Sequence, residues 1–172
     1  MRGSGKPRAG TAACLLLASS VVMQPSAVAA QGATYVNQRY GFSITLPKGW
    51  PVDATKLNGA GVVARYPGDA SATIQAFGYT PGQQDLRKDV EARVYTINHV
   101  PRTIHLLPET IANQSALRLI YYATVHRTQS ILHLETYLHA QGHGYAVICE
   151  AAPKTYVKIQ SSCLAATNSL RP

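Results

Sequence analysis

The sequence has few of the residues on which common enzyme and nucleic-acid signatures depend. Its 172 residues include only eight acidic side chains, three cysteines and one tryptophan. No G-x-S-x-G motif marks a nucleophilic serine, no glycine loop has phosphate-binding spacing, and no carboxylate pair suits glycosidase chemistry. The sixteen Lys and Arg residues form no basic stripe of the kind that binds nucleic acid. We therefore expect no catalytic residues, no cofactor and no nucleic-acid partner.

Residues 1–30 have the organisation of a secretory signal peptide. Three basic residues precede an apolar run from Ala9 to Met23, and "SAVAA" supplies small side chains for cleavage after Ala30. The run is shorter than the roughly 20 apolar residues that span a bilayer, which argues against a transmembrane anchor. Cys14 lies inside the run and not after it, so lipid attachment is not expected either. These features predict export, to the periplasm or the medium.

Removal of this segment takes away three basic residues and no acid, which leaves 142 residues and lowers the net charge from +8 to +5. That length suits one domain, which we expect to span residues 31–172. The remaining 142 residues have a mild positive charge. This charge permits contact with an acidic surface but does not indicate one. After cleavage, no further apolar stretch is a candidate for crossing a membrane.

Hydrophobic periodicity predicts an α+β fold with an antiparallel sheet packed between helices. Phe42, Ile44 and Leu46 alternate with polar residues, which is typical of a half-buried strand. The apolar positions after Pro81 change to a helical spacing. We expect helices over 83–99 and 153–169, and further strands over 61–67, 71–79, 103–112, 115–127, 131–140 and 144–151.

The hairpin formed by 115–127 and 131–140 suggests a contact surface. With 127–130 as its loop, Tyr122 would lie opposite Glu135. One face would then be apolar core, carrying Leu117, Leu119 and Tyr121 against Leu132, Leu134 and Leu138. The other face would be polar and aromatic. Because tyrosine is favoured at interfaces, this face is the candidate contact patch: Arg118, Tyr122, Glu135 and Tyr137. A covering helix over these tyrosines is the alternative.

A metal site is the second hypothesis for the same hairpin. His126, His133 and Glu135 would share the polar face, and imidazole with carboxylate suits Zn or Cu. His139 is too far from His133 to bind the same ion, because six strand residues span roughly 20 Å. Only two ligands are then secure, so we expect no bound metal; the alternative is a metal-binding protein or metal-dependent hydrolase.

The two remaining cysteines are expected to form a disulfide. Cys149 follows Tyr145 and Val147 at strand spacing, so it faces the core. Cys163 shares the apolar stripe of the last helix with Tyr156 and Ile159. Both sulfurs then point inward, and export places them where disulfides persist. We therefore predict a Cys149–Cys163 bridge.

The two ends of the 142-residue segment that remains after cleavage resemble PsbP-like domains. The motif Y-x-N-x-x-Y-G-F-S-I-T-L-P-K-G-W (residues 35–50) is similar to the start of these domains and of related exported bacterial families of the PsbP/Mog-type fold. The closing segment from Tyr137 to Leu170 resembles their last hairpin and helix. The resemblance implies an antiparallel sheet between helices and accessory or binding roles, including photosystem accessory proteins and a small-GTPase partner. The family shares no catalytic set.

These observations together predict an exported, non-catalytic binding or accessory protein. We expect its partner to be a protein or a small ligand. No metal or cofactor is required by this interpretation.

Overall fold

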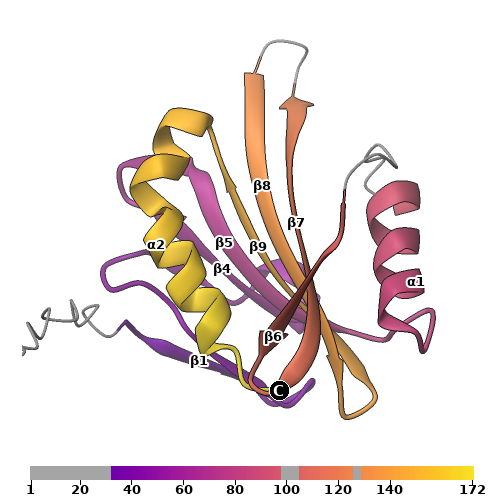
Figure 1. The fold of residues 1–172 in the computed structure, drawn as a ribbon. Helices are drawn as coiled ribbons and strands as arrows, with labels where there is room; N and C mark the ends of the chain where they lie inside the picture. The colour runs from indigo at the N-terminus through magenta and orange to yellow at the C-terminus, as the bar shows by residue number, and fades with distance from the viewer. Residues whose placement is uncertain (1–31, 98–104, 126–128) are drawn as a thin grey trace, which may run out of the picture.

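The computed structural model describes residues 32–97, 105–125 and 129–172. Its main feature is a seven-stranded antiparallel sheet in the order β3-β4-β5-β9-β8-β7-β6. Helix α2 (Pro153–Ser169) covers one face of this sheet, and helix α1 (Leu86–Glu91) lies against the other (Figure 1). The predicted fold class, an antiparallel sheet packed between helices, is confirmed.

The first described elements form a small separate hairpin. Strand β1 (Thr34–Asn37) pairs with β2 (Phe42–Thr45), whose alternating side chains put Phe42 and Ile44 in the core. Pro47 and Gly49 end the strand, and Trp50 then packs on Tyr66 with ring centroids 5.5 Å apart. The predicted half-buried strand is confirmed.

The next part of the chain builds one half of the main sheet. It consists of β3 (Val52–Asp53), the short 3-10 helix η1 (Lys56–Gly59), β4 (Gly61–Tyr66) and β5 (Asp69–Tyr79). Gly61 is required where β4 meets β5, since a Cβ there would lie 2.0 Å from the carbonyl oxygen of Ala76. Strands β4 and β5 match the strands expected over 61–67 and 71–79, with bounds that differ by one or two residues.

The helix expected over 83–99 is shorter at its start and changes geometry within its length. Asp85 caps α1 by accepting a hydrogen bond from the Lys88 backbone N–H, 2.9 Å away. After Glu91 the chain continues as a wider π-helical segment, η2 (Ala92–Ile97). Val90 and Val94 are fully buried, so the predicted apolar stripe does face the sheet. Residues 98 and 99 lie outside the described part.

The second half of the sheet is a meander followed by the last helix. Its strands are β6 (Leu107–Ile111), β7 (Gln114–Val125), β8 (Gln129–Ala140) and β9 (His143–Ala151). Pro153 occupies the first turn of α2, where a missing N–H costs nothing. Each strand and the helix correspond to an expected element, with bounds that differ by a few residues.

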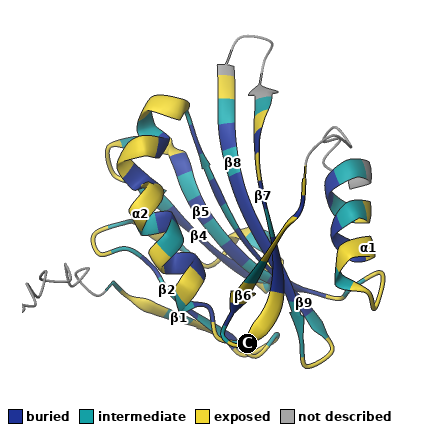
Figure 2. Cartoon of the chain, in the orientation of Figure 1, coloured by how far each residue is buried: buried dark blue, intermediate teal, exposed yellow. Residues whose placement is uncertain are grey.

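Two cores result, one on each face of the sheet (Figure 2). The larger core lies between the sheet, β2 and the inward stripe of α2, which includes Tyr156, Ile159 and Ala166. The smaller core lies beneath α1 and η2 and is built from Val90, Val94 and the β7 side chains of odd number. Since both faces are covered in part, neither face of the hairpin β7–β8 is simply core or simply surface.

Cys149 and Cys163 meet inside the larger core. Both are fully buried and unbonded to each other as thiols, with their side chains in hydrogen-bond contact. Burial, followed by the neighbouring Cys163 thiol, raises the pKa of the Cys149 thiol. The inward direction predicted for both sulfurs is confirmed, and the bridge itself stays a prediction.

We predict that oxidation closes the Cys149–Cys163 bridge in protein isolated from the envelope or the medium. A bridge that closes a loop of about 15 residues stabilises the fold by about 3 kcal/mol in the chain-entropy model. Mass spectrometry of the non-reduced protein should find the two cysteine peptides joined. Two freely titrating thiols in each folded chain, without added reductant, would contradict the prediction.

Candidate functional site

The register between β7 and β8 separates the four residues of the predicted contact patch. Leu119 lies opposite Glu135, and Tyr122 lies opposite Leu132. The expected pairing of Tyr122 with Glu135 is therefore wrong by three positions. Because side chains alternate along a strand, an odd shift moves one strand's side chains to the other face. Glu135 and Tyr137 consequently face α1, whereas Arg118 and Tyr122 are on the α2 side.

On the α1 side, Glu135 is a buried carboxylate held by two phenols. It is 1% exposed, and the hydroxyls of Tyr121 and Tyr137 each donate a hydrogen bond of 2.6 Å, one to each carboxylate oxygen. Such short, charge-assisted bonds compensate for the loss of water around the carboxylate. Burial, and then the nearby Glu135 charge, raises the pKa of both phenols well above their usual value. The two hydrogen bonds therefore hold the side chains of Tyr121, Glu135 and Tyr137 in place on the α1 side of the sheet.

His133 extends this network along β8, toward the connection between β7 and β8. Its ring stacks on Tyr121 with centroids 4.7 Å apart and planes 7° apart. Its Nδ1 atom lies 3.7 Å from Glu135 Oε1 and 3.5 Å from Glu150 Oε1. Neither is a hydrogen bond, and this buried nitrogen has no hydrogen-bond partner in the described part of the chain. Glu150 in turn accepts a bond from Gln75 Nε2, 3.0 Å away.

The metal hypothesis is tested only in part by this arrangement. His133 and Glu135 do lie side by side, as that hypothesis requires. His126, the third proposed ligand, lies outside the described residues. Among the residues that the structure describes, no group of three or more His, Cys, Asp and Glu side chains is arranged to hold a metal ion.

A second buried carboxylate joins α1 to the sheet. Asp89 accepts hydrogen bonds from the Tyr79 hydroxyl (3.0 Å) and the Gly82 backbone N–H (2.8 Å), and its Oδ2 lies 3.1 Å from His139 Nε2. Burial alone would raise the pKa of Asp89, but the hydrogen bonds, with His139 first, lower it below its usual value. The guanidinium of Arg93 lies 3.6 Å from the centre of the Tyr79 ring, as a cation–π contact.

Asp89 was not singled out in the sequence analysis. A signal was present in the sequence, because Asp89 is three residues after Leu86 and directly before Val90, on the inward side of the helix. An acidic residue at the edge of an apolar stripe needs a buried partner. That partner, His139, is 50 residues away in the sequence and could not be identified from spacing.

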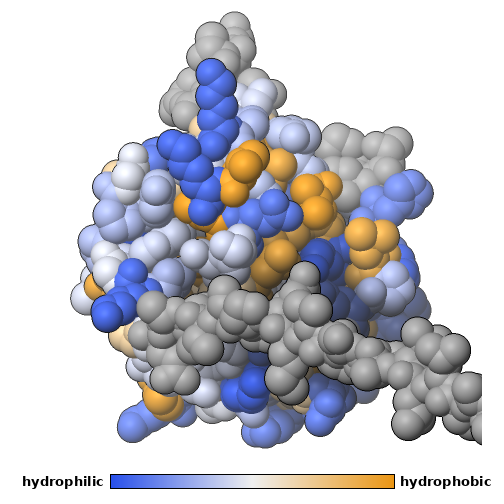
Figure 3. Space-filling view, turned by 60° about the vertical axis from the view of Figure 1, so that its left-hand side comes forward, coloured by the Kyte–Doolittle hydropathy of each residue, from blue (hydrophilic) through white to orange (hydrophobic). Residues whose placement is uncertain are grey.

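On the α2 side, β6 and β7 leave a strip of apolar side chains open to solvent. Leu107, Ile120 and Tyr122 are 53%, 50% and 64% exposed. Arg118 lies at the lower end of this strip and is paired with Glu109, with Nη2 and Oε1 2.6 Å apart. Viewed with the α2 side turned forward, hydrophobic side chains gather in the upper right of the surface (Figure 3). We call these four residues, Leu107, Arg118, Ile120 and Tyr122, the β7 strip.

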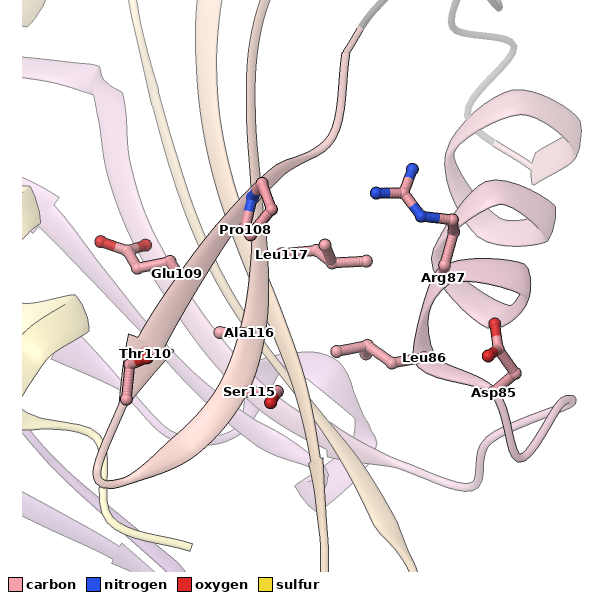
Figure 4. A pocket seen from close by; sticks show the side chains of 9 residues that line it. All are labelled: Asp85, Leu86, Arg87, Pro108, Glu109, Thr110, Ser115, Ala116 and Leu117. Atoms are coloured by element: carbon pink, nitrogen blue, oxygen red, sulfur yellow. The ribbon is translucent and has the colours of Figure 1, made fainter.

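A hollow of about 440 Å³ lies at the same edge of the sheet, toward α1 (Figure 4). Leu86 on α1 and Leu117 on β7 point toward each other across it, with Pro108 of the edge strand above. Proline at an edge strand removes a backbone donor and so discourages an added strand.

Comparison with known proteins identifies the fold. No protein-family model matches the chain, and no curated protein is similar to it in sequence. Among solved structures, cyanobacterial PsbP (CyanoP) from Synechocystis is 14% identical, with a TM-score of 0.58, and the match covers 86% of this chain and 95% of that one.

Two further structures match over most of the chain. LpqN of Mycobacterium tuberculosis, described as involved in cell envelope biogenesis, is 12% identical with a TM-score of 0.56. The match covers 81% of this chain and 83% of LpqN. A Pseudomonas aeruginosa protein of unknown function, described as a putative regulator, is 12% identical with a TM-score of 0.54 and covers 81% and 96%. At such identities the likeness shows the fold alone, and the PsbP-like fold is confirmed.

The structure also bears on membrane association. No helix among the described residues is long and apolar enough to span a bilayer.

We predict that Tyr137→Phe destabilises the protein by about 2 kcal/mol, because the buried Glu135 carboxylate loses one of its two donors. Urea unfolding at neutral pH measures this change. Tyr122→Phe is the matched control, since it removes the same hydroxyl from an exposed ring, and it should change stability by less than about 0.5 kcal/mol. Equal effects of the two variants would contradict the described network.

Proposed function

We propose that the chain is an exported, non-catalytic binding or accessory protein, and that the β7 strip is its contact surface. The observation that carries this proposal is the exposure of Leu107, Ile120 and Tyr122 next to one another on the outer strands. Large apolar side chains gathered on one surface are typical of contact sites. Two of the four residues predicted from the sequence, Arg118 and Tyr122, belong to this strip.

The arrangement favours a protein as the partner. The four residues of the strip do not line the hollow beside α1. A small ligand needs a concave site, so the strip suits a macromolecule better. Tyr122 combines a large apolar ring with a polar tip, as interface residues often do. The Arg118–Glu109 pair lies at the lower end, where charges orient a partner more than they strengthen its binding.

Three features support export. Residues 1–30 have the charge, apolar run and small-residue site of a signal peptide. The side chains of two buried cysteines are in contact, and in an oxidising compartment such a pair can form a disulfide. The fold is shared with LpqN, which is described as involved in cell envelope biogenesis. A role in the cell envelope is therefore part of the proposal.

Site-specific photocrosslinking in the native cell tests the β7 strip. A photoreactive amino acid in place of Tyr122 should give an adduct larger than the protein alone in the envelope fraction. Adding Ile120→Glu should reduce that adduct severalfold, because a charge in the strip must be desolvated on contact.

Val52 provides the matched control position. Like the apolar residues of the strip, Val52 is an apolar strand residue with a large exposed fraction, 46%. It lies in β3, at the opposite edge of the sheet. A crosslinker at Val52 should give no adduct, and Val52→Glu should not affect the adduct formed from position 122. Adducts of equal yield from both positions, or none from position 122, would contradict the proposed surface.

A further inference from the structure

A second hollow, of about 500 Å³, lies on the opposite side of the molecule from the α1 edge. One wall is the end of β2 and the turn that follows it, including Leu46, Pro47 and Trp50. The other wall is the C-terminal half of α2, where the residues facing the hollow are only serines and alanines, such as Ser162 and Ala165. These small side chains leave space that a leucine would fill, and the volume is in the range of small-molecule sites.

The two walls are fixed relative to each other. The Thr45 backbone N–H donates to Ser169 Oγ (2.8 Å), and Ser43 and Arg171 exchange two backbone hydrogen bonds of 2.9 Å. Trp50 is supported from another side by its contact with Tyr66. A hollow with fixed walls loses little conformational entropy when it is filled, which favours binding.

The lining combines carbon surface, several hydroxyl groups and a single charge. Pro47 and Trp50 offer carbon surface, whereas the Leu46 side chain is buried in the core. Each methylene buried against such surface contributes about 0.8 kcal/mol. Lys48 is the one charged residue of the described lining, and no carboxylate lies among those residues. The charge complement of this hollow is therefore an anion that carries an apolar chain.

We propose that this hollow binds a free single-chain fatty carboxylate, with its chain against Trp50 and Ala165 and its carboxylate at Lys48. This site is separate from the β7 strip and does not depend on the function proposed for that surface. A membrane surface or a second copy of the chain would use the same carbon surface differently, and the experiment below separates these occupants.

Trp50 makes the experiment direct, because it is the only tryptophan of the chain and its fluorescence reports on this hollow alone. Decanoate, added below its micelle concentration to the purified protein, should shift the Trp50 emission to the blue with saturation at one equivalent. A chain-brominated decanoate should quench the emission at the same concentrations.

Three variants test the assignment. Ala165→Leu should weaken decanoate binding about tenfold, since it fills space equal to two or more methylene groups. Lys48→Gln should weaken decanoate binding about threefold and leave decanol binding unchanged, as expected for an exposed charge contact. Lys56→Gln is the matched control, since Lys56 lies in η1 and is not part of the lining. It should bind like the wild type.

Several results would overturn the proposal. These are the absence of a saturable response, equal affinities of the wild type and Ala165→Leu, and a response to anionic phospholipid vesicles but not to decanoate. A decanoate response that appears only with dimerisation, measured by light scattering, would also overturn it. Circular dichroism of Ala165→Leu checks that the variant is folded; because residue 165 is exposed on α2, its fold should be retained.

Discussion

The pairing of β7 with β8 determines which side chains each helix meets. With Leu119 opposite Glu135, the odd-numbered side chains of both strands face α1, and the even-numbered ones face α2. Glu135 then lies between two tyrosines under partial cover, and Ile120 and Tyr122 lie beyond the reach of α2. A shift of one residue would place Glu135 and Tyr121 on opposite faces of the sheet and break the hydrogen bond between them. The register is therefore the constraint on which the Glu135 network and the β7 strip both depend.

The two faces of the sheet differ in chemistry for a physical reason. Helix α1 and η2 are short and cover little area, so the face beneath them includes polar groups that satisfy one another, with Glu135 and Asp89 as the two acceptors. Helix α2 is 17 residues long and buries a continuous apolar stripe. Helix α2 does not reach the β7 strip, which stays open to solvent. The small side chains of its C-terminal half also leave apolar surface uncovered beside Trp50.

Local patterns predicted most of the fold, because alternation and helical spacing are properties of neighbouring residues. The strand at Phe42, the inward stripe of α2 and the facing cysteines follow from them. The hairpin register did not, since it depends on the connection between β7 and β8. Val125 pairs with Gln129, a connection one residue shorter than the four-residue loop assumed from the sequence and placed differently. The partners of Asp89 and Glu135 depend on tertiary contacts and were missed for the same reason.

Chemical labelling of tyrosine tests the register most directly. When the folded protein is nitrated and its peptides are analysed by mass spectrometry, Tyr122, 64% exposed, should react readily. Tyr121 and Tyr137 should be protected until the protein unfolds, because both rings are buried and their raised pKa leaves little reactive phenolate. Labelling of Tyr137 as fast as Tyr122 in the folded state, or protection of Tyr122, would contradict the account.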